Sequence, residues 1–263
     1  MTTPGHIFDL TGRAAVVTGG NGGIGLGIAQ ALAAAGCNVS IWGRNADKNK
    51  SAAATMAGSP GKIDTRVCDV TDPASVKSAM TATLETFGRL DGCFANAGIG
   101  GGGRHAFIDR TEEQWRSMFA TNLDGVFHVF QAAARHMTER ATAGDPFGRL
   151  VATSSLASLF GTARNEHYAA TKAAINALVR ALAVELARQG VTANAILPGW
   201  IKSDMTAGIM ANEKFVANVM PRIPVRRFGE PSDFGGIAVY LMSRASSYHT
   251  ADCFVIDGGY TAF

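Results

Sequence analysis

The sequence predicts a single α/β domain of the Rossmann-like, doubly wound type, with helices on both faces of a seven-stranded parallel sheet. Three observations support this. Short, almost continuously apolar runs rich in β-branched residues alternate with longer segments of helical pattern. No linker or change of composition divides the 263 residues, so residues 1–263 are expected to form one domain. With 47% apolar and 17% charged residues, the chain has enough apolar material for a large core.

The apolar runs predict the strands in order. We expect them at 14–18, 39–42, 63–68, 91–95, 149–153, 191–197 and 253–256. Helices are expected at 24–35, where Gly36 ends the pattern, and near 46–57, 73–87, 111–140 and 163–189. Residues 203–231 are the least regular and contain Pro221, Pro224 and Pro231, so we expect an excursion over the ligand site. In such a fold that site lies beyond the carboxyl ends of the strands.

Charge and cysteine usage favour a soluble cytoplasmic protein. A formal net charge of +3 gives no indication of a nucleic-acid or membrane partner. Residues 1–10 lack a basic stretch followed by an apolar one, and no apolar run approaches about 18 residues, so neither a secretory signal nor a membrane span is expected. The cysteines, Cys37, Cys68, Cys93 and Cys253, form no CxxC pair and are expected to be reduced. The histidines have no metal-ligand spacing, so no metal is expected.

A glycine-rich turn joins the first strand to the first helix. It reads Thr18-Gly19-Gly20-Asn21-Gly22-Gly23-Ile24-Gly25. Glycines let the backbone approach a pyrophosphate, and free N–H groups at the start of the helix bind it. The turn lacks the Gly-Lys-Ser/Thr of a nucleoside-triphosphatase loop, which argues against a kinase or ATPase. A tight turn without a ligand is the alternative.

Further motifs follow in order, and together with the turn they resemble the compact branch of the short-chain dehydrogenase/reductase family. Thr18-Gly19-x-x-x-Gly23-Ile24-Gly25 is similar to that family's cofactor motif. The other matching residues are Asp69-Val70, Asn96-Ala97-Gly98, Asn122, Ser155, Tyr168, Lys172, Pro198-Gly199 and Asp257-Gly258-Gly259, with Ala95 where the family often has Asn. The resemblance covers almost the whole chain. It implies an oxidoreductase similar to 3-oxoacyl-carrier-protein reductases and to gluconate and alcohol dehydrogenases.

Tyr168 and Lys172 are four residues apart in an expected helix and therefore share one face. A free phenol has a pKa near 10, and a neighbouring ammonium lowers such a pKa by roughly 1–3 units. The phenol would then exchange a proton with a carbonyl or an alcohol near neutral pH. The alternative is a Tyr–Lys pair on a solvated helix face.

Ser155 follows a buried strand at its carboxyl end and would hydrogen-bond the substrate oxygen. Ser154 and Ser158 compete for this role, but the family's spacing to Tyr168 selects Ser155. By resemblance, Asn122 would shape its helix and hold a water in a proton relay through Lys172. A local kink or a bond from its side chain to the backbone is the alternative.

The resemblance also implies how the cofactor is held. Lys172 would bond the nicotinamide ribose, Ile201 would meet the carboxamide through its backbone, and Asp69 and Val70 would flank the adenine. The other implied cofactor contacts are Gly19, Asn21, Gly22, Gly23, Ile24, Asn96, Gly98, Tyr168, Pro198 and Gly199.

The end of the second strand favours NADP(H). An NAD-binding fold usually has an acidic residue there, whereas this chain has Gly43 followed by Arg44. A guanidinium pairs with a 2′-phosphate in a fork geometry. Many NADP-preferring relatives have a second basic residue in the glycine turn, which Asn21-Gly22 lacks, and Asp47 is near in sequence. NAD(H) is therefore the alternative cofactor.

The leading function is hydride transfer between NADP(H) and a ketone or secondary alcohol, as in a 3-oxoacyl reductase or a carbonyl reductase. The alternatives are an NAD(H)-dependent polyol or sugar-acid dehydrogenase and a non-catalytic dinucleotide sensor. Candidates to line the substrate pocket are His105, Phe107, His167, Trp200 and Met205, and the glycine run 100–103 is either a flexible wall or a solvated loop. Arg222, Arg226 and Arg227 would meet an acidic carrier or a carboxylate, or else lie on a solvated surface.

The assembly is expected to be a homotetramer, with a dimer as the runner-up. The alanine-rich helix near 163–189 has apolar residues on more than one face, and such a helix needs more than one partner surface.

Overall fold

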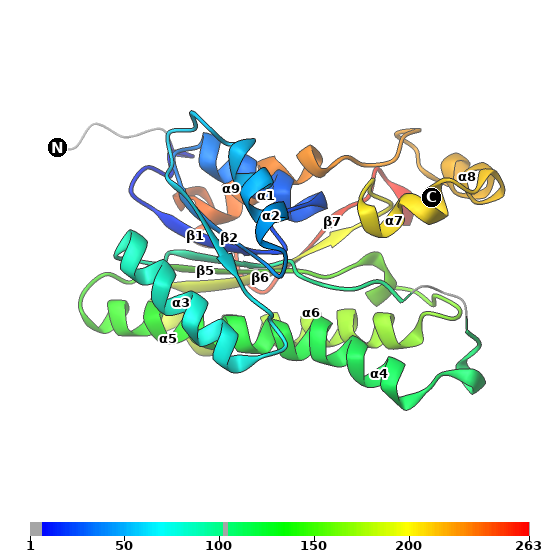
Figure 1. Ribbon diagram of the computed structural model, residues 1–263, viewed down its shortest axis with the longest axis horizontal. Coiled ribbons are helices and arrows are strands. Elements are labelled where there is room, and N and C mark those ends of the chain that lie inside the picture. The colour runs from blue at the N-terminus through cyan, green and yellow to red at the C-terminus, as the bar shows by residue number, and fades with distance from the viewer. Residues whose placement is uncertain (1–6, 102–104, 263) are drawn as a thin grey trace.

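In the computed structural model, which describes residues 7–101 and 105–262, seven parallel strands form one sheet in the order β3-β2-β1-β4-β5-β6-β7 (Figure 1). The strands are β1 (Ala14–Thr18), β2 (Asn38–Gly43), β3 (Ile63–Val67), β4 (Gly92–Ala95), β5 (Gly148–Thr153), β6 (Val191–Pro198) and β7 (Cys253–Ile256). This confirms the predicted fold class. The predicted strands differ from the observed ones by at most one residue at each end.

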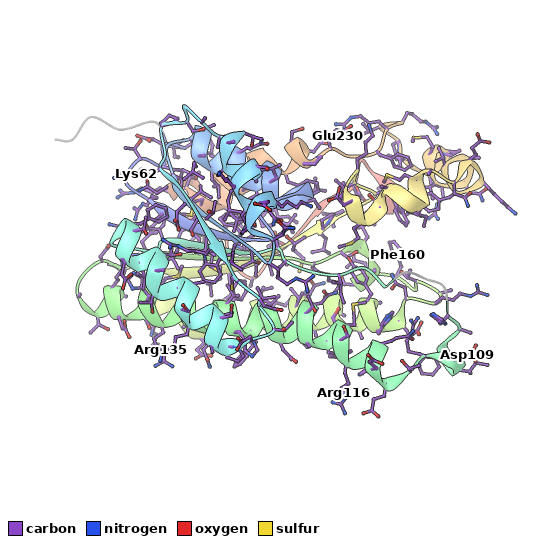
Figure 2. All side chains as sticks on the ribbon, in the orientation of Figure 1. Lys62, Asp109, Arg116, Arg135, Phe160 and Glu230 are labelled. Atoms are coloured by element: carbon purple, nitrogen blue, oxygen red, sulfur yellow. The ribbon has the colours of Figure 1, made fainter. Side chains whose placement is uncertain are left out.

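Helices cover both faces of the sheet. The helices α1 (Gly23–Ala34), α2 (Ala46–Ala54) and α9 (Gly235–Met242) lie on one side, and α3 (Pro73–Phe87), α5 (Gly125–Thr142) and α6 (Glu166–Leu186) lie on the other (Figure 1). On the second side, α4 (Glu112–Phe119) extends beyond the sheet. Arg116 of α4 and Arg135 of α5 point away from the sheet, because the outer side of this layer is polar (Figure 2).

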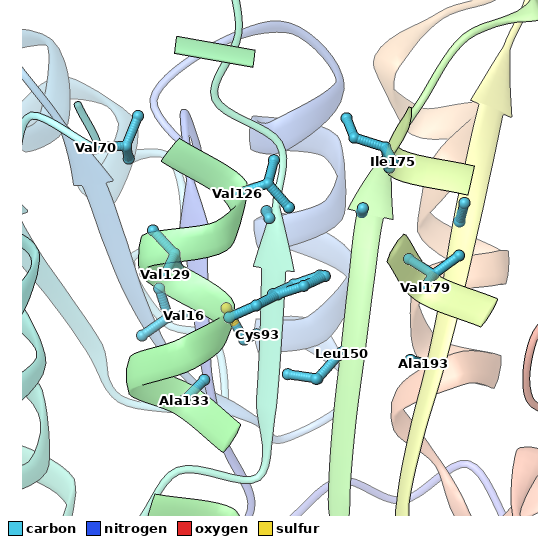
Figure 3. Packing of buried hydrophobic residues seen from close by; sticks show 14 of the residues in the cluster. Val16, Val70, Cys93, Val126, Val129, Ala133, Leu150, Ile175, Val179 and Ala193 are labelled. Carbon is cyan, nitrogen blue, oxygen red and sulfur yellow. The ribbon is translucent and has the colours of Figure 1, made fainter. Parts of the chain in front are cut away.

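The core has two halves, one on each face of the sheet. Figure 3 shows Val16, Cys93 and Leu150 of the sheet packed against Val129 of α5 and Val179 of α6. The other half is built from the opposite strand faces with α1 and α9. Both faces of the inner strands β1, β4, β5 and β6 are covered, which explains why these strands are mainly apolar rather than alternating, whereas the edge strand β3 is half-buried and contains Asp64 and Arg66. Cys37, Cys68 and Cys93 are buried and, like Cys253, are free thiols, as expected.

Three helical segments differ from the sequence expectation. The expected helix at 111–140 is α4, a π-helical turn at Ala120–Asp124 and then α5. The excursion at 203–231 contains α7 (Asp204–Met210) and α8 (Glu213–Val219), which are too short to give a periodic signal. Helix α9 was not predicted, because its sequence GGIAVYLM is apolar almost all round. Among the described residues, no helix combines the length and apolarity needed to cross a bilayer.

The sheet reverses its strand order between β1 and β4, which is where a doubly wound fold forms its crevice. The Thr18 hydroxyl at the end of β1 accepts hydrogen bonds from the backbone N–H groups of Asn96 and Ala97, both at 3.0 Å. The Asn96 side chain in turn donates to the Thr18 carbonyl oxygen at 3.2 Å. These bonds fix the glycine turn and the loop after β4 side by side.

Candidate active site

The glycine turn leaves the first turn of α1 able to bind an anion. Gly19 and Gly23 have φ values of +63° and +50°, which favour glycine. Gly22, the N-cap of α1, provides no side-chain hydrogen bond, and no acidic residue lies in the first helical turn. Gly22, Gly23 and Ile24 line a pocket, so the uncapped start of the helix borders the cleft. The turn fits a pyrophosphate on these grounds.

A cleft runs along the carboxyl ends of the strands as two adjoining pockets of about 360 Å³ each. We call the pocket next to Tyr168 the catalytic half and the pocket next to Arg44 the adenosine half. The predicted cofactor residues in the catalytic half are Gly19, Asn21, Gly22, Gly23, Ile24, Asn96, Gly98, Tyr168, Lys172, Pro198, Gly199 and Ile201. Arg44, Asp69 and Val70 line the adenosine half, together with Gly19, Asn21 and Gly98. The fold therefore brings every predicted cofactor contact to one elongated cleft.

Ser155, Tyr168 and Lys172 meet in the catalytic half. The Lys172 ammonium lies 5.5 Å from the centre of the Tyr168 ring and donates a 2.7 Å hydrogen bond to the Thr153 carbonyl oxygen at the end of β5. Ser154 is buried, and its hydroxyl donates to the Lys172 carbonyl oxygen at 2.9 Å. Ser155 Oγ accepts from the Ala157 N–H at 3.1 Å, which leaves its O–H group, unlike that of Ser154, able to donate to a substrate.

The expectation that Lys172 lowers the pKa of Tyr168 is wrong. Burial raises the pKa of the phenol, and a hydrogen bond with Ser155 lowers it by less. Burial also lowers the pKa of Lys172 to about 8, because a buried ammonium loses its hydration. At neutral pH the phenol is thus a protonated donor, which suits proton delivery to a carbonyl oxygen.

Asn122 lies in the π-helical turn and is fully buried. Its side chain accepts from the Ile99 N–H at 2.8 Å and donates to the Ile99 carbonyl oxygen at 2.9 Å. This is the side-chain bond to the backbone that the sequence left as an alternative. Both the amide oxygen and the amide nitrogen of Asn122 are engaged, so the geometry gives Asn122 the role of holding the loop after β4. Ile99 lines the cleft, and Asn122 does not.

The substrate end was predicted less well. Of the five candidates, Met205 lines the catalytic half. His105 and Phe107 are exposed, His167 is buried, and Trp200 packs edge-on against Phe215 with ring centres 4.8 Å apart. These four side chains do not line the catalytic half, because closeness in sequence to a motif does not determine where a side chain points. In the glycine run, Gly100 lies against Met205, whereas Gly102 and Gly103 are outside the described residues.

The three arginines of the excursion do not line the cleft. Arg227 pairs with Asp233 at 2.6 Å, Arg226 donates to the Pro221 carbonyl oxygen at 2.6 Å, and Arg222 stacks on Tyr260. Their partners satisfy them locally, as the surface alternative expected.

Several cleft residues were missed from the sequence: Lys48, Thr153, Ser203, Asp204 and Thr206. Lys48 and Asp204 form a 2.6 Å ion pair although 156 positions separate them. One signal was available for Lys48. Helix α2 starts directly after β2, at the Asn45 N-cap, and this places its first turn at the cleft.

The geometry defines a dinucleotide-fold oxidoreductase site, and comparison with known proteins identifies the family. A family model described as Enoyl-(Acyl carrier protein) reductase matches residues 19–261. The chain belongs to the short-chain dehydrogenase/reductase family and is an oxidoreductase acting on the CH–OH/C=O couple.

Its relatives include proteins of more than one specificity. It is 33% identical to a 3-oxoacyl-(acyl-carrier-protein) reductase of Chlamydia pneumoniae, over 97% of this chain and 99% of the relative. It is 35% identical to a gluconate 5-dehydrogenase of Gluconobacter oxydans, over 97% of each chain. A crystal structure of a gluconate 5-dehydrogenase from Burkholderia cenocepacia, in complex with NADP and tartrate, superposes with a TM-score of 0.90 at 32% identity and covers 98% of both chains.

Proposed function

We propose that this protein is an NADP(H)-dependent oxidoreductase that transfers hydride between the nicotinamide and a ketone or secondary alcohol. The observation that carries this is the shared cleft. Ser155, Tyr168 and Lys172 lie at one end of it, and Arg44 lies at the other. The NADP named in the Burkholderia structure supports the same cofactor here.

The space at position 43 supports NADP(H) over NAD(H). A Cβ atom on Gly43 would lie 2.3 Å from Asn21 Nδ2 and 2.5 Å from Asn49 Oδ1. Asn49 is 1% exposed and donates to the carbonyl oxygens of Gly43 and Arg66, both at 2.9 Å, so it is not free to move. Position 43 therefore has no room for the acidic side chain that binds the ribose hydroxyls in an NAD-binding fold. Asp47 lines neither half of the cleft, which leaves Arg44 to meet a 2′-phosphate.

Each catalytic side chain has a distinct role. NADPH, when bound, supplies the hydride. Ser155 hydrogen-bonds the substrate oxygen, and Tyr168 donates the proton that this oxygen takes up. The bond of the Lys172 ammonium to the Thr153 carbonyl oxygen holds the lysine 5.5 Å from the centre of the Tyr168 ring, at the end of the cleft where the nicotinamide ribose would lie. Asn122 positions the loop after β4 through Ile99.

Steady-state kinetics test the proposal. We expect kcat/KM for reduction to be higher with NADPH than with NADH over a panel of 3-oxoacyl thioesters, keto-sugar acids and simple ketones. A higher kcat/KM with NADH would overturn the cofactor assignment. Absence of nicotinamide turnover over the whole panel, and over the matching alcohols, would oppose the reaction class.

Gly43→Asp should fail to create a preference for NADH. We expect it to lower the free energy of unfolding by about 1–3 kcal/mol, because the new Cβ overpacks against the pinned Asn49. Thermal unfolding and the NADPH/NADH ratio of kcat/KM measure both effects. Gly236→Asp is the matched control, since a Cβ there meets nothing within 4 Å. A Gly43→Asp protein of unchanged stability that prefers NADH would contradict the steric argument.

We also propose that the protein is a homotetramer. Two apolar side chains on the helices that would pair between subunits support this: Phe127 of α5 is 48% exposed and Val184 of α6 is 80% exposed.

A further inference from the structure

Lys48 occupies a position in the cleft that no cofactor motif accounts for. Among the described residues, it is the one charged side chain that lines both the catalytic and the adenosine half. Its ammonium reaches across the cleft from α2 to α7 and pairs with Asp204 Oδ2 at 2.6 Å. The pair therefore joins the cofactor side of the cleft to the start of the excursion.

The ammonium of Lys48 lies over the glycine turn. A Cβ atom on Gly22 would be 3.1 Å from Lys48 Nζ and 3.2 Å from its Cε, so the lysine tip fills the space that a side chain at position 22 would enter. Arg44 lines the adjoining adenosine half, where Asp69 is the carboxylate. Asp69 accepts from both the N–H and the hydroxyl of Thr71, which leaves the two cations as the groups suited to a further anion.

We propose that Lys48 is a second recognition group for the 2′-phosphate of NADP(H), and that Asp204 competes with this phosphate for the Lys48 ammonium. The inference rests on the proposed function and extends it to cofactor specificity. The pyrophosphate, which NAD and NADP share, already has the uncapped start of α1. The 2′-phosphate would otherwise have Arg44 as its one cationic partner in the adenosine half, among the described residues.

The exchange of partners is physically favourable. The side chains of Lys48 and Asp204 are 45% and 88% exposed, and an ion pair this exposed contributes only about 0–1 kcal/mol. A phosphate monoester carries roughly two negative charges at neutral pH and three acceptor oxygens, against one charge for a carboxylate. NADP(H) would therefore release Asp204, whereas NAD(H), which lacks the 2′-phosphate, would leave the pair intact.

Dissociation constants of the two reduced dinucleotides test this in the intact protein, by fluorescence titration without substrate. Lys48→Gln should weaken NADPH binding about tenfold, equivalent to about 1.4 kcal/mol, and change NADH binding less than about twofold. Asp204→Asn should have the opposite sign: it removes the competitor, so NADPH binds about two- to fivefold more tightly and NADH is unaffected. The matched controls are Lys202→Gln and Glu230→Gln. These two residues form an exposed 2.6 Å pair between the residue before the excursion and its end, they line neither half, and both variants should leave binding unchanged.

Three results would overturn the inference. Equal weakening of NADPH and NADH by Lys48→Gln would place the ammonium on the shared pyrophosphate. Weakening of both by Asp204→Asn would make the pair a clasp that retains any dinucleotide. No change in either variant would leave Lys48 without a cofactor role. If the wild type prefers NADPH and Arg44→Gln removes that preference, any of these three results overturns the role of Lys48 and leaves the proposed cofactor standing. If the wild type prefers NADH, the proposed cofactor fails first.

Discussion

Replacing Tyr168 by Phe will lower the rate of ketone reduction by about 10²–10⁴-fold, the usual contribution of a positioned general acid. The substitution removes one oxygen atom and keeps the ring that lines the catalytic half of the cleft. Burial keeps the wild-type phenol protonated, so the group that is lost is the proton donor itself. Dinucleotide binding should persist, because the glycine turn and Arg44 are untouched.

Single-turnover loss of NADPH absorbance measures the chemical step, and fluorescence titration measures the dissociation constant of NADPH. Tyr240→Phe is the matched control: that hydroxyl bonds His249 Nδ1 at 2.9 Å and lines neither half of the cleft, so turnover should stay at the wild-type rate. A Tyr168→Phe rate within threefold of wild type would remove the phenol from the reaction.

Asp91→Asn should destabilise the fold by about 3–5 kcal/mol, the cost of removing one member of a buried ion pair. Asp91 lies at the amino end of the central strand β4, opposite the cleft, and its side chain is fully buried. Its carboxylate accepts from the Ala14 N–H at 2.9 Å and pairs with Arg13 and Arg89 at 2.9 and 2.6 Å, and Arg140 lies 3.2 Å away. An amide cannot balance these cations and presents them with an N–H donor in place of an acceptor.

Thermal and urea unfolding measure this loss. Asp145→Asn is the control within the same cluster, and its 49% exposed side chain predicts a change of only about 0–1 kcal/mol. Comparable losses in the two variants would show that burial of Asp91 is not what makes its pairing important.

The same carboxylate predicts a pH dependence of stability. Burial raises the pKa of Asp91, but the hydrogen bonds from Arg89 and the Ala14 N–H and the charges of Arg89 and Arg13 outweigh it and leave the pKa below its usual value. A lowered folded-state pKa gives stability that is present above the unfolded pKa of about 3.9 and is lost as the pH falls through the folded value. The acid-dependent loss should be smaller in Asp91→Asn than in the wild type.

The sequence predicted the inner strands well because they are buried on both faces and appear as short, mainly apolar runs. The edge strands β3 and β7 are only half-buried, and β3 (IDTRV) was placed although three of its five residues are polar or charged. Helix α9 was missed because an all-apolar helix of eight residues has no periodic face. The break between α4 and α5 coincides with Asn122, whose buried bonds reach Ile99, and the local helical pattern does not report such a contact.

In the site, the glycine turn, Asp69-Val70, Asn96-Ala97-Gly98, Ser155 and Pro198-Gly199 located the cleft, because each lies at or just after the carboxyl end of a strand. Contacts between segments far apart in the chain, and the burial of single side chains, could not be predicted from these motifs. The ion pair of Lys48 with Asp204 joins segments far apart in the chain, and the raised pKa of Tyr168 depends on burial, which the four-residue spacing to Lys172 does not report.

A crystal structure of the protein soaked with NADPH tests the central claim most directly. The claim predicts that the nicotinamide ring lies in the catalytic half, with space for one substrate carbonyl group between the ring and the Tyr168 hydroxyl. It also predicts that the 2′-phosphate lies at Arg44. A dinucleotide bound in the reverse direction, or a Tyr168 hydroxyl turned away from the ring, would contradict it.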